Sequence, residues 1–164
     1  MAKHFVFLAN IPDHERLVPT IEGIDTLPGV QSWHAVDGHV NLVVEVEGDT
    51  DRLIQHLATC AGDVPITLCE VLAENGNVPA LSPDSCHAWV FLDVEGAKID
   101  AVRRTLIESG SVLKTLVSRG GCDLIALVEG ASFSVVDRFI TEKITPLDGV
   151  LRLKYNRIIN LTTL

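Results

Sequence analysis

The stretch Trp89-Val-Phe-Leu92 decides the fold, because a near copy of it, Phe5-Val-Phe-Leu8, stands 84 positions earlier. Further along, Gly38-His-Val-Asn-Leu42 aligns with Gly120-Gly-Cys-Asp-Leu124 at a spacing of 82. Similarity at a nearly constant period indicates that one structural unit occurs twice. Between the copies, residues 73–85 are rich in Pro, Gly, Asn and Ser, which is typical of a linker. We therefore predict a first repeat over 1–73, a linker over 74–86 and a second repeat over 87–164.

Each copy has the same order of predicted elements, strand-helix-strand-strand-helix-strand. In the second copy, apolar residues at helical or alternating spacing predict strands at 89–94, 112–118, 124–129 and 150–161, and helices from Ile99 to Gly110 and from Ser132 onward. In the first copy the corresponding strands are expected at 4–11, 30–36, 41–47 and 64–72, with helices at 14–27 and after Asp49 or Thr50. Pro19 is awkward inside the first helix and predicts a late start or a kink.

A βαββαβ unit folds as a four-stranded antiparallel sheet with both helices on one face. The fold class is therefore α+β, with tandem ferredoxin-like βαββαβ repeats of the dimeric α+β barrel type. If the other face of the sheet is apolar, it has to be covered. The two copies could cover each other, or each could pair with a second chain. We expect a homo-oligomer, at least a dimer.

Composition limits the environment and the partners. No apolar run reaches the roughly 20 residues that span a bilayer, and the N-terminus does not resemble a signal peptide. Scattered cysteines without a C-x-x-C pair suggest free thiols in a reducing cytoplasm. The net charge of −9 argues against direct binding of nucleic acid. The whole net charge lies in residues 1–80, which contain 3 Lys/Arg and 12 Asp/Glu. This difference between the halves could be a neutral variation between two solvated surfaces. Alternatively, the acidic half could bind a basic partner such as Arg152–Arg157 of another subunit.

The second copy resembles a known family, the effector-binding (RAM) domain of the Lrp/AsnC, or feast/famine, regulators. The residues that carry the resemblance are Ala88–Val94, the turn Arg119-Gly-Gly-Cys-Asp-Leu124, Leu127–Glu129, Val136–Ile144 and Pro146–Val150. Cys122 replaces an aromatic residue of the family pattern. No helix-turn-helix segment precedes the first strand, so direct DNA binding is not carried over. The resemblance implies a sheet-mediated oligomer that binds a small effector, commonly an amino acid, near the hairpin turn at a subunit interface.

The candidate ligand-binding residues follow from that turn and its counterpart in the first copy. They are Gly120, Gly121, Cys122 and Asp123, with Gly38, His39 and Asn41. The carboxylate of Asp123 could receive an amino group, and backbone N–H groups of the turn could receive a carboxylate. Equally, Asp123 could accept only local backbone bonds. Cys122 could be a reactive thiol, although a small, half-buried cysteine explains it as well.

No catalytic site is recognisable in the sequence. His34, His39, His56 and His87 have no metal-ligand spacing, although His34 and His39 flank one hairpin. We expect no metal and no cofactor. The leading hypothesis is a cytoplasmic ligand-sensing or assembly module that acts through protein partners, such as regulators of the same family. The alternatives are a small enzyme of the dimeric α+β barrel class, for which Trp33, His34 and Asn41 are the relevant residues, and a purely structural oligomerisation module.

Overall fold

The computed structural model describes residues 2–9, 14–37, 40–62, 65–76 and 81–159. They form two compact units, one of residues 1–71 together with 159–164, and one of residues 72–158. The division falls inside a strand, so the repeat and linker boundaries given above stay a prediction. Each unit is described by itself below.

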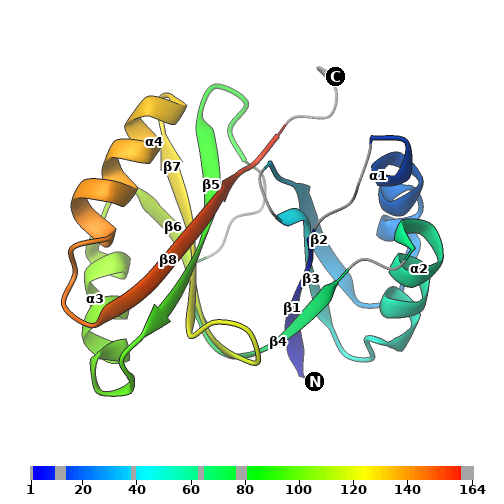
Figure 1. Cartoon of the computed structure of the whole chain (residues 1–164), viewed down its shortest axis with the longest axis horizontal. Helices are drawn as coiled ribbons and strands as arrows, with labels where there is room; N and C mark the ends of the chain where they lie inside the picture. Colours follow the sequence, from blue (N-terminus) through cyan, green and yellow to red (C-terminus); the bar gives the residue numbers. More distant parts are fainter. Residues whose placement is uncertain (1, 10–13, 38–39, 63–64, 77–80, 160–164) are drawn as a thin grey trace. The chain divides into compact units, whose positions relative to one another are not determined.

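The first unit has the predicted order of elements. They are β1 (Lys3–Ala9), α1 (His14–Ile21), the short helix η1 (Ile24–Thr26), β2 (Val30–Ala35), β3 (Val40–Glu47), α2 (Asp51–Ala61) and β4 (Ile66–Asn75). The strands lie in the order β2-β3-β1-β4. Strand β1 is antiparallel to both of its neighbours, and the two helices lie on one face of the sheet (Figure 1).

The second unit repeats this arrangement. Its elements are β5 (Cys86–Val94), the short helix η2 (Gly96–Lys98), α3 (Ile99–Glu108), β6 (Val112–Arg119), β7 (Leu124–Gly130), α4 (Phe133–Phe139), the π-helical turn η3 (Ile140–Ile144) and β8 (Val150–Arg157). Its strands lie in the order β6-β7-β5-β8, with antiparallel pairs. The predicted α+β class, with ferredoxin-like antiparallel sheets and helices on one face, is confirmed.

Strand register reproduces the two spacings found in the sequence. In the first unit Phe5 pairs with Glu45. In the second unit Trp89 pairs with Leu127. Trp89 stands 84 positions after Phe5, and Leu127 stands 82 positions after Glu45. Residues that align in the sequence therefore occupy equivalent positions in the two sheets.

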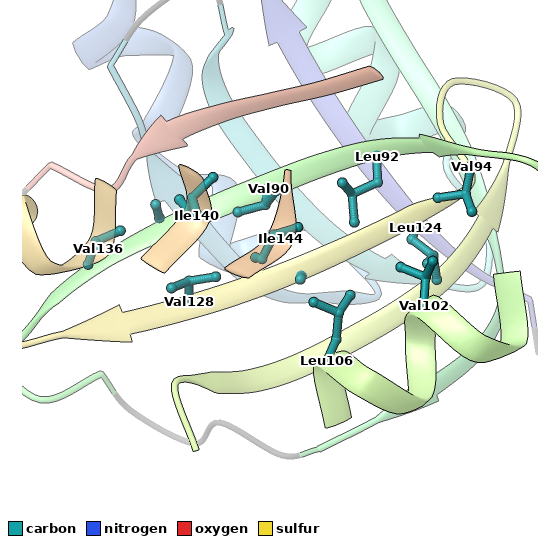
Figure 2. Close-up of a cluster of buried hydrophobic side chains, with 12 residues drawn as sticks. Val90, Leu92, Val94, Val102, Leu106, Leu124, Val128, Val136, Ile140 and Ile144 are labelled. Carbon is teal, nitrogen blue, oxygen red and sulfur yellow. The ribbon is translucent and has the colours of Figure 1, made fainter. Parts of the chain in front are cut away.

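Alternation along the strands gives the second sheet two different faces. On the face toward α3 and α4, Val90 and Leu92 of β5 pack with Val128 of β7 and with Val102 and Ile140 of the helices. Figure 2 shows these side chains gathered in one layer between sheet and helices. The register turns other apolar residues, Trp89, Phe91, Ile125 and Leu127, to the opposite face. The second sheet is therefore apolar on both faces.

Several element ends differ from the expectations. The first helix ends at Ile21 rather than residue 27, because Gly23 adopts a left-handed φ of 78°. Strand β4 extends to Asn75 rather than residue 72. The predicted cap at Ser132 is confirmed, since its Oγ accepts a hydrogen bond from the Val135 N–H at 3.2 Å. The helix that it caps continues as the π-helical turn η3, which the apolar spacing does not reveal.

The turn before β8 depends on a glycine. Gly149 has a φ of 99°, and its carbonyl accepts a hydrogen bond from the Glu95 N–H at 2.8 Å. A Cβ built on Gly149 would lie 2.4 Å from the Cβ of Lys98. Lys98 is also paired with Asp148 at 2.8 Å, and that hydrogen bond and charge raise the pKa of Lys98. Any side chain at position 149 would therefore collide with the start of α3.

We predict that Gly149→Ala destabilises the protein by about 2 kcal/mol or more. The alanine would have to adopt the left-handed backbone conformation, and its Cβ would overlap with Lys98. Urea unfolding measures the change. Gly96→Ala is the matched control, because a Cβ there meets nothing within 4 Å. Equal stability of the two variants would contradict this account of the turn.

Candidate functional site

The turn that joins β6 to β7 is the best-defined candidate in the second unit. It contains Gly120, Gly121 and Cys122 between the end of β6 at Arg119 and the start of β7 at Leu124. Gly120 has a φ of 104°, which favours glycine at this position. Both glycines are exposed, so their backbone is open to a ligand.

Asp123 ties this turn to the end of β5. Its backbone N–H donates to the Leu92 carbonyl at 2.9 Å. Its carboxylate Oδ2 accepts a hydrogen bond from the Val94 N–H at 2.8 Å. The backbone carbonyl of Asp123 accepts from the Ser118 N–H at 3.0 Å. Asp123 therefore accepts hydrogen bonds from backbone N–H groups, as the sequence analysis allowed. One comes from Ser118 in the local hairpin, and the other comes from Val94 in β5, 29 residues away.

Ser118 and Cys122 hold the turn from its inner side. The Ser118 hydroxyl donates to the Cys122 carbonyl at 2.9 Å, and its Oγ lies 3.8 Å from the Cys122 Sγ. Both residues are buried. The Cys122 side chain thus belongs to the packing of the turn. Ser118 has no signal in the sequence, since its partner is a backbone carbonyl that only the closed hairpin presents.

The corresponding residues of the first copy stand at or just before the start of β3 in the sequence. Gly38 and His39 lie outside the described residues, and for Asn41 the structure describes only its place in β3. The structure therefore brings together four of the seven candidate residues, those of the second copy.

A groove of about 500 Å³ lies on the helical side of the second unit. Leu106, Phe139 and Leu147 supply its apolar lining, and Thr105 and Lys143 supply polar groups. Its volume is within the range of small-molecule sites. Sequence reasoning missed it, because the groove forms where α3 meets the π-helical turn. That turn is marked by the hydrogen bond from the Thr145 N–H to the Ile140 carbonyl at 2.9 Å.

Among the described residues, no group of three or more His, Cys, Asp or Glu side chains is arranged to hold a metal ion. In the same part of the chain, no helix has the length and apolar character to cross a membrane. None of Cys60, Cys69, Cys86 and Cys122 forms a disulfide bond.

No protein-family model and no curated protein matches the chain. Solved structures do. The siroheme decarboxylase NirDL shares 10% identity over 96% of this chain and 71% of its own, with a TM-score of 0.73. A putative monooxygenase from Lactobacillus acidophilus shares 9% identity over 96% of this chain and 92% of its own, with a TM-score of 0.54. FFRP-DM1 shares 27% identity over 45% of this chain and 99% of its own, with a TM-score of 0.44.

These likenesses establish the fold and leave the function open. Proteins with unrelated activities share this architecture, and a fold does not fix a function. The function has to be argued from the residues of this chain.

We predict that Asp123→Ala destabilises the protein by about 1–3 kcal/mol, because the buried end of β5 loses the acceptor for the Val94 N–H. Asp123→Asn keeps an oxygen acceptor and should cost less than half as much. Chemical denaturation measures both, with the exposed Asp84→Ala as control. If Asp123→Ala behaves like Asp84→Ala, the carboxylate does not hold the turn.

Proposed function

We propose that this chain is a ligand-sensing or assembly module, similar to the effector-binding domain of the Lrp/AsnC regulators, and that it binds a small effector such as an amino acid at the Gly120–Asp123 turn. The observation that carries the proposal is an exposed glycine turn anchored by a carboxylate. Asp123 bonds both Leu92 and Val94. Ordering one backbone residue costs on the order of 1–2 kcal/mol, so a turn that is already fixed binds with a smaller entropic cost.

The chemistry of the turn suits a zwitterion. Asp123 is partly exposed, so the carboxylate that accepts from Val94 can also receive an ammonium group. Successive backbone N–H groups at Gly120 and Gly121 can receive a carboxylate. A free amino acid carries both groups a short distance apart. The Gly38, His39 and Asn41 turn is proposed as a second, weaker site, since Asn41 supplies no negative charge.

We propose that the effector binds where two subunits meet. The resemblance to the Lrp/AsnC effector domain supports this proposal, because it implies a site at a subunit interface. The apolar residues on the face of the second sheet away from its helices, Trp89, Phe91, Ile125 and Leu127, are already buried within one chain. The module would then be at least a dimer in the cytoplasm and would act on protein partners, with regulators of the same family as candidates. Its net charge of −9 disfavours direct contact with nucleic acid.

The enzyme alternative requires a pocket between sheet and helices lined by His or Asn. Trp33 and His34, the residues named for that alternative, stand in the first unit, where a packed cluster that includes Leu42, Val44 and Leu53 fills this layer and Trp33 packs against it. In the second unit a corresponding apolar cluster fills the layer (Figure 2). The groove beside α3 is the feature that would favour an additional small-molecule site. The experiment below therefore separates the turn from the groove.

We predict that at least one amino acid raises the melting temperature of the native protein. Ligand at 100 times its dissociation constant stabilises the folded state by about 2.7 kcal/mol. A thermal-shift screen with the free amino acids measures this. The proposal fails if no amino acid or other small metabolite produces a shift.

Two variants locate the site. Asp123→Asn should abolish the shift, because it removes the charge that receives the ammonium group. Thr105→Trp, at an exposed position that lines the groove, should leave the shift intact. The opposite pattern would place the ligand in the groove and overturn the assignment to the turn.

A further inference from the structure

Cys60 and His56 form a close pair on α2 of the first unit. They stand one helical turn apart, and the Cys60 Sγ lies 3.9 Å from the His56 Nδ1. Residues four apart on a helix occupy the same face, so the pairing follows from the helix itself. Both residues are partly exposed. A thiol beside an imidazole is the arrangement that activates a cysteine nucleophile.

The second nitrogen of His56 determines the tautomer. Its Nε2 lies 2.9 Å from the backbone carbonyl of Thr20. A carbonyl oxygen can only accept, so Nε2 carries the hydrogen in the neutral ring and Nδ1 presents its lone pair to the thiol. Thr20 stands in the last turn of α1, where helix carbonyls lack a partner within the helix. His56 is therefore oriented by the packing of α1 against α2.

We propose that Cys60 is a site of covalent modification by low-molecular-weight disulfides, with His56 as its general base. The Cys60 thiol gives its proton to the His56 Nδ1 as Sγ attacks one sulfur of the disulfide. The disulfide bond of the reagent breaks and a mixed disulfide with Cys60 forms. The departing thiolate takes the proton from Nδ1 and leaves as a thiol, so Cys60 is oxidised and half of the reagent is reduced.

The position of Cys60 makes the base necessary. Cys60 is the penultimate residue of α2 and so lies far from the N–H groups of the helix N-terminus, which activate cysteines at other sites. The attack therefore depends on proton transfer to His56 during the reaction. His56 therefore raises the rate of disulfide exchange at Cys60. Among the described residues, it does not raise the rate at any other cysteine.

Cys86 is the matched comparison. Like Cys60 it is free and partly exposed, whereas Cys69 and Cys122 are buried. His87 follows it in β5, but neighbouring strand residues point to opposite faces, and the His87 Nε2 is engaged with Glu129 at 2.8 Å. Cys86 thus falls in the same partly exposed class, although it packs against the core cluster of the second unit, and it has no imidazole aimed at its sulfur.

The test exposes the full chain to oxidised glutathione and follows the mixed disulfide at each cysteine by peptide mass spectrometry. We expect Cys60 to react at least about 10-fold faster than Cys86. We also expect His56→Gln to slow Cys60 by 10-fold or more, because a general base contributes on the order of 10²–10⁴-fold. The rate at Cys86 should not change. Cys60→Ser should remove the fast adduct.

Unchanged reaction of Cys60 in His56→Gln, or a faster reaction at Cys86, would overturn the proposal. Circular dichroism checks that the variant is folded. If His56→Gln does not fold, the wild-type protein still decides the question. The ratio of the Cys60 and Cys86 rates should fall to about one in denaturant, and a ratio equal in the native and denatured states would contradict the role of the fold.

Discussion

Two helices cover one face of a four-stranded sheet, and this constraint determines where each unit can carry a binding site. In the second unit the covered face is filled by Val90, Leu92, Val128 and the apolar residues of α3 and α4. Interiors packed to this degree leave little room for a ligand. Binding chemistry is therefore expected at the ends of the strands and on the helical surface. The Gly120–Asp123 turn and the groove beside Leu106 are both in such places.

Asp123 connects the fold to the proposed function. Its bonds to Leu92 and Val94 fix the turn against β5, and the same carboxylate carries the charge that would receive an ammonium group. A single residue then serves both stability and recognition. The two roles can be separated, because an amide at this position keeps the acceptor and loses the charge.

The sequence predicted those features that depend on neighbouring residues. The apolar run from Trp89 to Val94 predicted β5, the Gly120-Gly121 turn predicted the hairpin of β6 and β7, and Ser132 predicted a helix start. Each of these depends on local backbone geometry and on which face is apolar.

Features that depend on distant partners were not predictable in this way. The bond from Val94 to Asp123 joins residues that only the folded hairpin brings together. The orientation of His56 depends on a backbone carbonyl at Thr20, which has no sequence signal. The π-helical turn after Phe139 is not revealed by apolar spacing. The groove forms beside that turn, so it could not be predicted from the sequence either. The early end of α1 at Ile21 differs from these features, because it follows from the local conformation of Gly23.

The most direct test of the account is a crystal structure of the native protein with the amino acid that stabilises it most. The account predicts electron density for the ligand against Gly120 and Gly121, with its ammonium group within hydrogen-bond distance of the Asp123 carboxylate and a second subunit closing the site. Ligand density in the groove beside Leu106 would contradict the account. So would a turn that holds no ligand although the protein is saturated with the amino acid.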